Sequence, residues 1–208
     1  SEVELAQDLA ESPIFALTGT NGKTTTTTLL GRLLATKYGK DKTGVGGNIG
    51  IPLSETALKI GKGGALAAEI SSFQMEATAY FHPHVSAVLN VTPDHIIRHG
   101  SMDVYQAMKE RIFAHEGAGD FVVLSYDDER VRGMKDRVPA GVRVCYFSRT
   151  QDLDEGMVLD GDTLTLRWDG KTIPFVTVDE LGIKGPHNVE NALAATAMAY
   201  FAGCDPEA

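Results

Sequence analysis

A short run near the start of the chain has the composition of a loop that binds phosphate. Gly19-Thr20-Asn21-Gly22-Lys23-Thr24-Thr25 follows the apolar run 14–17 and precedes a stretch with helical periodicity. The N–H groups of such a loop and the N-terminus of a helix present partial positive charge to an anion. Lys23 adds a full charge, and the hydroxyl of Thr24 is placed for Mg²⁺. The run therefore predicts an ATP or GTP site.

The run departs from the longer phosphate-loop pattern, G-x-x-x-x-G-K-[ST]. Leu17 stands where that pattern has its first glycine, so the match is to the shorter G-x-x-G-K-T. Strand, loop and helix still follow in the required order. The alternative is a glycine-rich turn with a surface lysine, which would place Lys23 at the positive end of a helix without an anion. The five threonines at 24–28 have poor helix propensity. We still expect a helix to begin there, because the geometry of a phosphate site requires one.

Three further residues suit chemistry on a phosphorylated substrate. Glu69 is the lone charge of an apolar run, at the end of a predicted buried strand. There we expect it to bind a metal ion or to position water. The alternative is that its side chain simply faces solvent. His95, with Asp94, follows the next predicted strand and is either part of the same rim or an ordinary surface histidine. Lys109 stands between aromatic residues on a helix. It either extends to solvent or is partly buried with a lowered pKa, as nucleophilic or carbamate chemistry requires.

Other polar residues give weaker signals, and each has a purely structural alternative. Asn48 lies in a second glycine-rich loop, where a plain turn is the alternative to a substrate contact. Ser71 and Gln74 either cap the next helix or face a substrate. Asn188 and Asn191 begin the last helical stretch, where N-capping competes with a contact to adenine.

Composition and charge restrict the class of protein. The 208 residues are 43% hydrophobic and 23% charged, as in a globular protein of one or two domains. No apolar run approaches the roughly 20 residues of a membrane span, and the acidic N-terminus lacks the features of a secretory signal. The net charge of −9 argues against a nucleic-acid partner. Cys145 and Cys204 fit neither a disulfide framework nor a zinc site, so we expect a reducing, cytoplasmic environment.

Short apolar runs alternate with helix-period stretches, which predicts βαβ units and a doubly wound, mainly parallel α/β sheet. Strands are expected at 14–17, 43–45, 65–70, 85–91, 121–124 and 142–147, with helices at 23–38, 53–60, 73–80, 104–115 and 129–135. Short strands at 157–159, 163–168 and 171–176, separated by Asp-Gly turn signals, predict a small antiparallel section against one edge of the sheet. An alanine-rich helix over 188–201 is expected to pack at the end.

Six motifs, in order, resemble those of the Mur ligase family. They are Gly19 to Thr25, Gly46 to Gly50, Glu69 to Glu76, Asn90 to His95, Tyr105 to Lys109 and His187 to Leu193. Together they span nearly the whole chain and are more specific than any single motif. The resemblance implies that residues 1–208 form one central, ATP-binding domain of a three-domain amide ligase. The domain that holds UDP and the domain that binds the amino acid are then absent, and this domain alone does not ligate.

The resemblance also implies an activity. The loop 46–50 and the run 71–74 favour a ligase that activates the carboxylate of UDP-N-acetylmuramoyl-L-alanine as an acyl phosphate, which D-glutamate attacks in peptidoglycan precursor synthesis. ATP and Mg²⁺ are the implied cofactors, because two anions must be brought together. Two alternatives stay open: another Mur-type or folylpolyglutamate-type ligase with a different substrate, and a phosphate-loop regulatory module that hydrolyses little.

Residue roles follow from the same resemblance. Lys23 is implied to bind the β- and γ-phosphates, and Thr24 the Mg²⁺ between them. Glu69, His95 and Lys109, the last as a carbamate, are implied to support a second Mg²⁺ near the substrate carboxylate.

The remaining roles concern the organic parts of the ligands. The residues implied to face the muramoyl-alanine are Asn48, Ser71 and Gln74, and those implied to lie near adenine are Asn188 and Asn191. Ile97 departs from the family, which often has an aspartate there, before an arginine. A contact made by that aspartate is therefore not expected in this chain.

Overall fold

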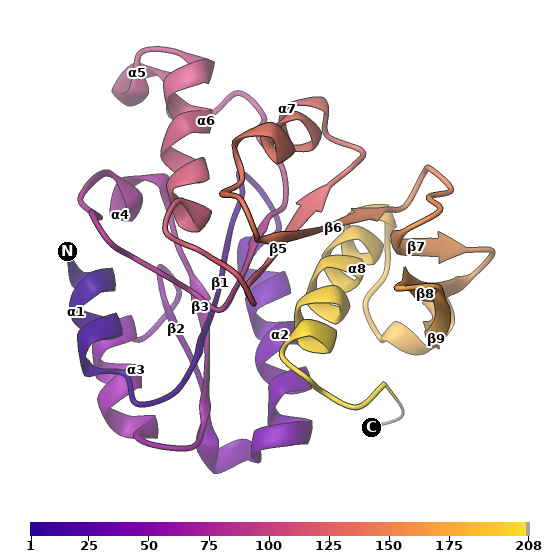
Figure 1. Ribbon diagram of the computed structural model, residues 1–208, viewed down its shortest axis with the longest axis horizontal. Helices are drawn as coiled ribbons and strands as arrows, with labels where there is room; N and C mark the ends of the chain where they lie inside the picture. The colour runs from indigo at the N-terminus through magenta and orange to yellow at the C-terminus, as the bar shows by residue number, and fades with distance from the viewer. Residues whose placement is uncertain (207–208) are drawn as a thin grey trace.

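Within residues 1–206, which the computed structural model describes, nine strands form a single sheet (Figure 1). The strands are β1 (Ile14–Thr18), β2 (Thr43–Gly47), β3 (Ala65–Glu69), β4 (Val85–Val88), β5 (Phe121–Ser125), β6 (Arg143–Ser148), β7 (Gly156–Asp160), β8 (Thr163–Trp168) and β9 (Lys171–Thr177). Their order is β2-β3-β1-β4-β5-β6-β7-β8-β9. Neighbours from β2 to β7 are parallel, and β8 and β9 are antiparallel. The predicted mainly parallel α/β sheet with an antiparallel section is confirmed.

Helices lie on both faces of the parallel strands. They are α1 (Glu2–Leu9), α2 (Lys23–Tyr38), α3 (Leu53–Ile60), α4 (Ser72–Glu76), α5 (Ile96–His99), α6 (Met102–Glu110), α7 (Glu129–Arg132) and α8 (Pro186–Phe201). Short 3₁₀ turns cover Lys40–Lys42, Arg111–Phe113, Gly133–Arg137 and Val178–Leu181. Figure 1 shows α2 and α8 side by side, away from α1 and α3.

The central strands are mostly apolar, as expected of strands with both faces covered, and Glu69 at the end of β3 is a charged exception. Every residue of β1 and β3 is buried. Phe15 and Leu17 of β1 pack in one core with side chains of α2 and α8. Ile14 and Ala16 point the other way and pack in a second core with α1, α3 and α6. The sheet therefore separates two hydrophobic cores and is held rigid at its centre.

The threonine run forms the first turns of α2 despite its poor helix propensity. The hydroxyl of Thr27 donates to the Lys23 carbonyl at 2.8 Å, and that of Thr28 donates to the Thr24 carbonyl at 2.8 Å. The hydroxyl of Thr26 donates to Oδ1 of Asn191 in α8 at 3.2 Å. Bonds to the preceding turn and to a neighbouring helix thus satisfy these hydroxyls where the phosphate loop requires a helix to begin.

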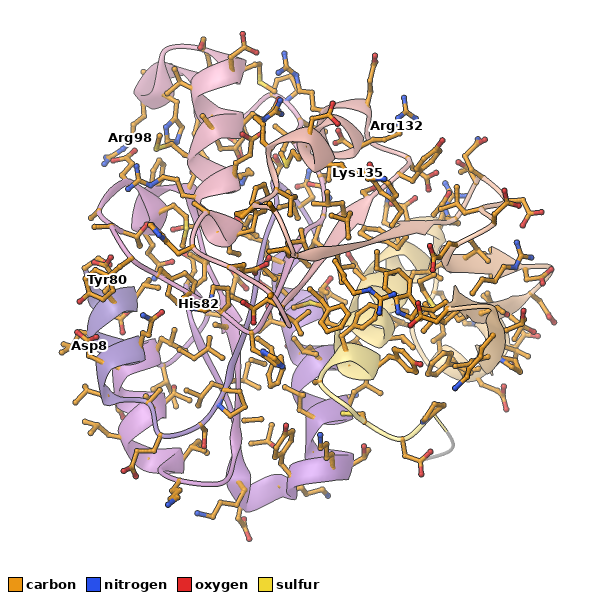
Figure 2. All side chains as sticks on the ribbon, in the orientation of Figure 1. Asp8, Tyr80, His82, Arg98, Arg132 and Lys135 are labelled. Carbon is orange, nitrogen blue, oxygen red and sulfur yellow. The ribbon has the colours of Figure 1, made fainter. Side chains whose placement is uncertain are left out.

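Several predicted boundaries are wrong, and tertiary contacts explain them. The helix expected at 73–80 ends at Glu76, because the N–H groups of Ala79 and Tyr80 donate to the carboxylate of Glu4 in α1. Figure 2 shows Tyr80 beside Asp8 of α1, and its hydroxyl donates to Asp8 at 2.9 Å.

The other differences follow the same logic. The strand expected at 85–91 ends at Val88, because the next residues bond to other loops of the rim. Helices expected at 104–115 and 129–135 tighten into 3₁₀ turns after Glu110 and Arg132. The helix expected at 188–201 begins earlier, at Pro186, and α1 and α5 were not predicted.

The antiparallel section extends the main sheet at the edge beyond β6, as the sequence predicts. β7 pairs with β6 in parallel and with β8 in antiparallel orientation. Asp169 and Gly170, between β8 and β9, have φ angles of 50° and 72°, as a tight type I′ hairpin requires. The Asp-Gly signals in the sequence therefore identified both hairpin turns.

The structure also bears on the predictions about membrane spans and about the two cysteines. Within 1–206, no helix combines the length and the apolar character that a bilayer crossing needs. Cys145 and Cys204 are both buried, free thiols, so neither forms a disulfide. The spacing of the cysteines had excluded a disulfide framework.

The buried carboxyl of Glu116 is expected to make stability depend on pH. Glu116 is 4% exposed, and its oxygens lack a hydrogen bond of ordinary geometry although the Ser86 hydroxyl lies nearby. Burial raises its pKa to about 9; Ser86 opposes this shift and the charge of Asp120 adds to it.

Because the unfolded carboxyl ionises near its ordinary pKa of 4.5 and the folded one near 9, stability falls as pH rises between these values. We expect Glu116→Gln to flatten this slope and to stabilise the protein by about 1–3 kcal/mol at pH 8. Urea unfolding of both proteins from pH 5 to 9 measures the slope. The two slopes would be the same if Glu116 were ionised in the folded protein.

Candidate functional site

The candidate site lies where the carboxyl ends of three neighbouring strands meet. β1 lies between β3 and β4, and the parallel register pairs Leu17 with Glu69 and Thr18 with Val88. The loop 19–22, the end of β3 and the residues after β4 therefore begin at the same level. Strand order reverses around β1, and such switch points form ligand crevices in open α/β sheets.

The loop after β1 has the backbone of an anion-binding turn. Gly22 is the N-cap of α2 with φ of 82°, and no side chain caps the helix. The first intrahelical bond runs from the N–H of Thr26 to the Gly22 carbonyl at 2.9 Å, so the N–H groups of residues 23–25 have no acceptor within the helix. These free donors and the helix dipole are suited to an anion, and binding of ATP here stays a prediction.

Gly22 is expected to tolerate no side chain. A Cβ on Gly22 would collide with Oδ1 of Asn191, and the left-handed φ alone costs roughly 1–2 kcal/mol. We expect Gly22→Ala to weaken ATP binding at least tenfold, measured by calorimetry. Gly182→Ala is the matched control, because Gly182 has φ of 67° with open space around it. Equal affinities for the two variants would mean that the collision at Gly22 is irrelevant to binding.

Lys23 folds back over the loop that precedes it. Its ammonium donates to the carbonyls of Gly19 and Thr20, both at 3.0 Å. Burial lowers the pKa of Lys23, and the charges of Glu69 and Asp94 oppose that shift. Lys23 therefore does not point into solvent, and its charge lies over the loop where phosphate would bind.

Glu69 is buried at the rim and hydrogen-bonded from both sides. It is 2% exposed; Oε2 accepts from the Thr24 hydroxyl at 2.9 Å, and Oε1 accepts from the Asn48 amide at 2.8 Å. The alternative in which Glu69 faces solvent is wrong. A hydroxyl and a carboxylate side by side, next to a phosphate loop, fit Mg²⁺, which prefers oxygen ligands and keeps phosphate oxygens and water in its remaining positions.

Lys109 reaches the same loop from α6. Its side chain is 1% exposed, its ammonium donates to the Gly19 carbonyl at 2.9 Å, and it lies 4.4 Å from the centre of the Tyr105 ring. Burial lowers the pKa of Lys109 to about 7; the nearby charge of Lys23 adds to this shift, and Asp94 opposes it. The alternative in which Lys109 extends to solvent is therefore wrong. A neutral amine is accessible near pH 7.

His95 stands directly before α5 and packs against α4. It has a left-handed φ of 52°, its ring nitrogen lies 3.4 Å from the Asp94 carboxylate, and its ring packs on Phe73 at 4.8 Å. Its side chain is half exposed. Among residues 1–206, no group of three or more His, Cys, Asp or Glu side chains is arranged to hold a metal ion. The structure thus joins Thr24, Glu69 and Lys109 to the loop, and His95 stays a predicted ligand.

Ser71 and Gln74 form the N-terminal cap of α4. The N–H of Gln74 donates to the Ser71 hydroxyl at 3.3 Å, and the N–H of Ser71 donates to Oε1 of Gln74 at 3.0 Å. The capping role that the sequence offered as an alternative is therefore observed. The cap fixes both side chains at the end of the loop that follows Glu69, and their contact with a substrate stays a prediction.

Asn188 and Asn191 lie on the first turns of α8, beside the phosphate loop. The N-cap of α8 is Gly185, without a side-chain bond, so the N-capping alternative is wrong. Asn191 is 8% exposed; its amide donates to Oδ1 of Asn188 at 3.2 Å. A cavity opens here, lined by Asn21, Gly22, Leu89, Asn90, Phe147, His187, Glu190 and Asn191. The cavity lies beside the phosphate loop, and the placement of adenine near these residues stays a prediction.

Sequence reasoning missed two supporting residues of the site. The side chain of Asn90 bonds to the backbone of the loop, although the sequence showed only that it opens the motif after β4. His99 of α5 is buried, and its ring lies 3.1 Å from the Ser72 hydroxyl. The helix α5 was not predicted from the sequence, so the contact between His99 and Ser72 could not be predicted either.

Ile97 is fully exposed on α5. The neighbouring Arg98, labelled in Figure 2, donates two hydrogen bonds to Glu76 of α4, at 3.0 and 2.8 Å. The Arg98–Glu76 pair therefore connects α5 to α4, and the side chain of Ile97 takes no part in this connection.

Comparison with known proteins defines the class of this fold and site. The model of the Mur ligase middle domain matches residues 17–199. The chain therefore belongs to the Mur ligase family.

Curated relatives narrow the comparison within the family. A protein of Pelotomaculum thermopropionicum named UDP-N-acetylmuramoylalanine--D-glutamate ligase is 47% identical over 206 residues, covering 98% of this chain and 44% of its own length. Proteins of the same name from Caldanaerobacter subterraneus and Clostridioides difficile are each 44% identical, with matches covering 44% and 45% of their own lengths. This chain spans less than half the length of these relatives.

Solved structures agree on the fold. A UDP-N-acetylmuramoyl-L-alanyl-D-glutamate--2,6-diaminopimelate ligase superposes with a TM-score of 0.73 at 24% identity, covering 99% of this chain and 47% of that one. A MurF ligase from Thermotoga maritima, solved in complex with ADP, superposes with a TM-score of 0.65 at 17% identity, covering 98% of this chain and 49% of that one.

Proposed function

We propose that this chain is the ATP-binding central domain of a cytoplasmic ligase that joins D-glutamate to UDP-N-acetylmuramoyl-L-alanine in peptidoglycan precursor synthesis. The observation that carries the proposal is the convergence of Lys23, the buried Lys109 and the Thr24–Glu69 pair at the phosphate loop and the first turn of α2. The names of relatives that are 40–47% identical support the choice of substrates.

We propose that the whole activity also needs the parts of the relatives that lie outside the matched region. Relatives have more than twice its length, and we propose that their remaining residues form one domain that holds UDP and another that brings the amino acid. The central domain then supplies the nucleotide and the carboxylate-activating groups. On its own we expect it to lack ligation activity.

The first step transfers phosphate to the substrate. The N–H groups at the start of α2 bind the β- and γ-phosphates of ATP, and Lys23 moves from the loop carbonyls to the phosphate oxygens. A carboxylate oxygen of the muramoyl-alanine attacks the γ-phosphorus, and ADP leaves. Mg²⁺, held by Thr24 and Glu69, would neutralise phosphate charge during this step.

The second step forms the amide. The amine nitrogen of D-glutamate attacks the acyl carbon and loses a proton, and phosphate leaves with one oxygen of the original carboxylate. Glu69, His95 and the carbamate of Lys109 would support a second Mg²⁺ beside that carboxylate. Closure of the crevice excludes water, which would otherwise hydrolyse the acyl phosphate.

Substrate contacts are assigned by position. We propose that Asn48, Ser71 and Gln74 hold the muramoyl-alanine, because they surround the end of β3 next to Glu69. Asn191, which lines the cavity beside the loop, and Asn188, whose Oδ1 accepts from the Asn191 amide, would lie near adenine. No serine or cysteine nucleophile is needed in this reaction.

A substrate panel tests the proposal in the full-length protein. ADP release that depends on both UDP-N-acetylmuramoyl-L-alanine and D-glutamate is the expected result. ADP release with L-alanine, meso-diaminopimelate or a folate substrate instead would indicate another ligase of the family. ATP binding without ADP release on any substrate would favour a regulatory module and overturn the proposal.

A further inference from the structure

The side chain of Asn90 makes three hydrogen bonds to the backbone of the phosphate loop. Its Oδ1 accepts from the N–H of Thr20 at 2.9 Å and from the N–H of Asn21 at 2.8 Å. Its amide donates to the carbonyl of Asn21 at 3.1 Å. The Asn90 carbonyl also accepts from the N–H of Thr20, at 3.0 Å. A single residue in the segment after β4 thus holds the loop that follows the neighbouring strand, β1.

We propose that Asn90 is a positioning residue that holds the phosphate loop in its anion-binding conformation before the nucleotide arrives. This inference rests on the proposed function, because it assigns the loop to ATP. Asn90 acts through the backbone of Thr20 and Asn21 and needs no direct contact with phosphate.

The bonding pattern divides the N–H groups of the loop into two sets. Those of Thr20 and Asn21 point to Oδ1 of Asn90 and are occupied. Those of residues 23–25 have no acceptor within the helix and are free. The β- and γ-phosphates therefore bind at the free N–H groups of residues 23–25. Asn90 fixes the N–H groups of Thr20 and Asn21, and this keeps the free groups pointing toward the phosphates. Preorganised donors bind an anion without a further ordering cost.

Asparagine is suited to this place because its side chain carries both an acceptor and a donor. Aspartate keeps the acceptor for the two N–H groups but cannot donate to the Asn21 carbonyl, and it adds a negative charge beside the phosphate site. Alanine removes all three side-chain bonds and leaves the N–H of Asn21 without its acceptor. The two replacements therefore separate loss of order from charge repulsion.

Hydrogen exchange and nucleotide affinity in the full-length protein test this role. In Asn90→Ala, we expect faster exchange of the Asn21 amide in the absence of nucleotide. We also expect about tenfold weaker binding of ADP with little change for AMP, since AMP lacks the phosphates that the loop holds. In Asn90→Asp, we expect slow Asn21 exchange and a larger loss for ADP than in Asn90→Ala, reduced by added salt.

The outcomes distinguish this role from general stabilisation and from failure of the proposed function. Equal losses for ADP and AMP, with a lowered melting temperature, would mean that Asn90 only supports the fold and would overturn the inference. If Asn90→Ala had the same ratio of ADP to AMP affinity as the unchanged protein, the inference would be overturned. This would hold even if Lys23→Ala abolished binding and so supported the role of the loop itself. If the unchanged protein bound neither nucleotide, the proposed function would fail, and with it the role of Asn90 in binding.

Discussion

Lys23→Ala is expected to reduce ligation by the full-length protein about 10³-fold, the largest effect of any single substitution considered for this site. The ammonium of Lys23 lies over the loop carbonyls at 3.0 Å and has only to turn to reach bound phosphate. Its removal leaves the developing charge on the transferred phosphate without a nearby cation. ADP formation under saturating ATP measures the loss.

Lys59→Ala provides the matched control for this experiment. Lys59 is an exposed lysine of α3, so its replacement changes net charge equally but leaves the loop intact. We expect this variant to keep the rate of the unchanged protein. Similar rates for Lys23→Ala and the unchanged protein would exclude a phosphate-binding role for Lys23.

The second large effect concerns Lys109. Because its pKa is about 7, a substantial share of the amine is neutral at pH 7, and a neutral amine can attack CO₂ and lose a proton to form a carbamate. We expect Lys109→Gln to lower ligation roughly 10²- to 10³-fold. We also expect removal of dissolved CO₂ to slow the unchanged protein, and added bicarbonate to restore it.

The pH dependence has a definite sign. As pH falls below about 7, Lys109 becomes protonated and cannot attack CO₂, so the dependence on bicarbonate becomes steeper at lower pH. Lys62→Gln, at an exposed lysine after α3, is expected to behave as the unchanged protein does. If Lys109→Gln responded to bicarbonate as the unchanged protein does, the carbamate would not lie on Lys109.

Most of the sheet could be predicted because its signals are local. The helix 53–60 was predicted with the observed bounds, since its apolar spacing and flanking residues are unambiguous. The Asp-Gly signals placed the antiparallel strands, because both turns have a positive φ at a glycine, 63° at Gly161 and 72° at Gly170. Glu69 stood out because a lone carboxylate in an apolar strand needs partners, and Thr24 and Asn48 supply them.

What the sequence could not predict depends on contacts between distant segments. The end of α4 is set by Glu4, more than 70 residues earlier, and no local pattern at 77–80 shows this. Asn90 contacts the loop from the segment after β4, a contact that exists only once β1 and β4 are adjacent. The depressed pKa of Lys109 likewise requires burial that sequence spacing suggests but does not establish.

Oxygen transfer from the substrate carboxylate tests most directly whether this rim activates a carboxylate with ATP. The full-length protein would be given UDP-N-acetylmuramoyl-L-alanine with ¹⁸O in its alanyl carboxylate, together with ATP and D-glutamate. An acyl phosphate requires that one ¹⁸O atom appear in the inorganic phosphate released with each amide formed. Unlabelled phosphate, formed together with the amide, would contradict carboxylate activation at this site.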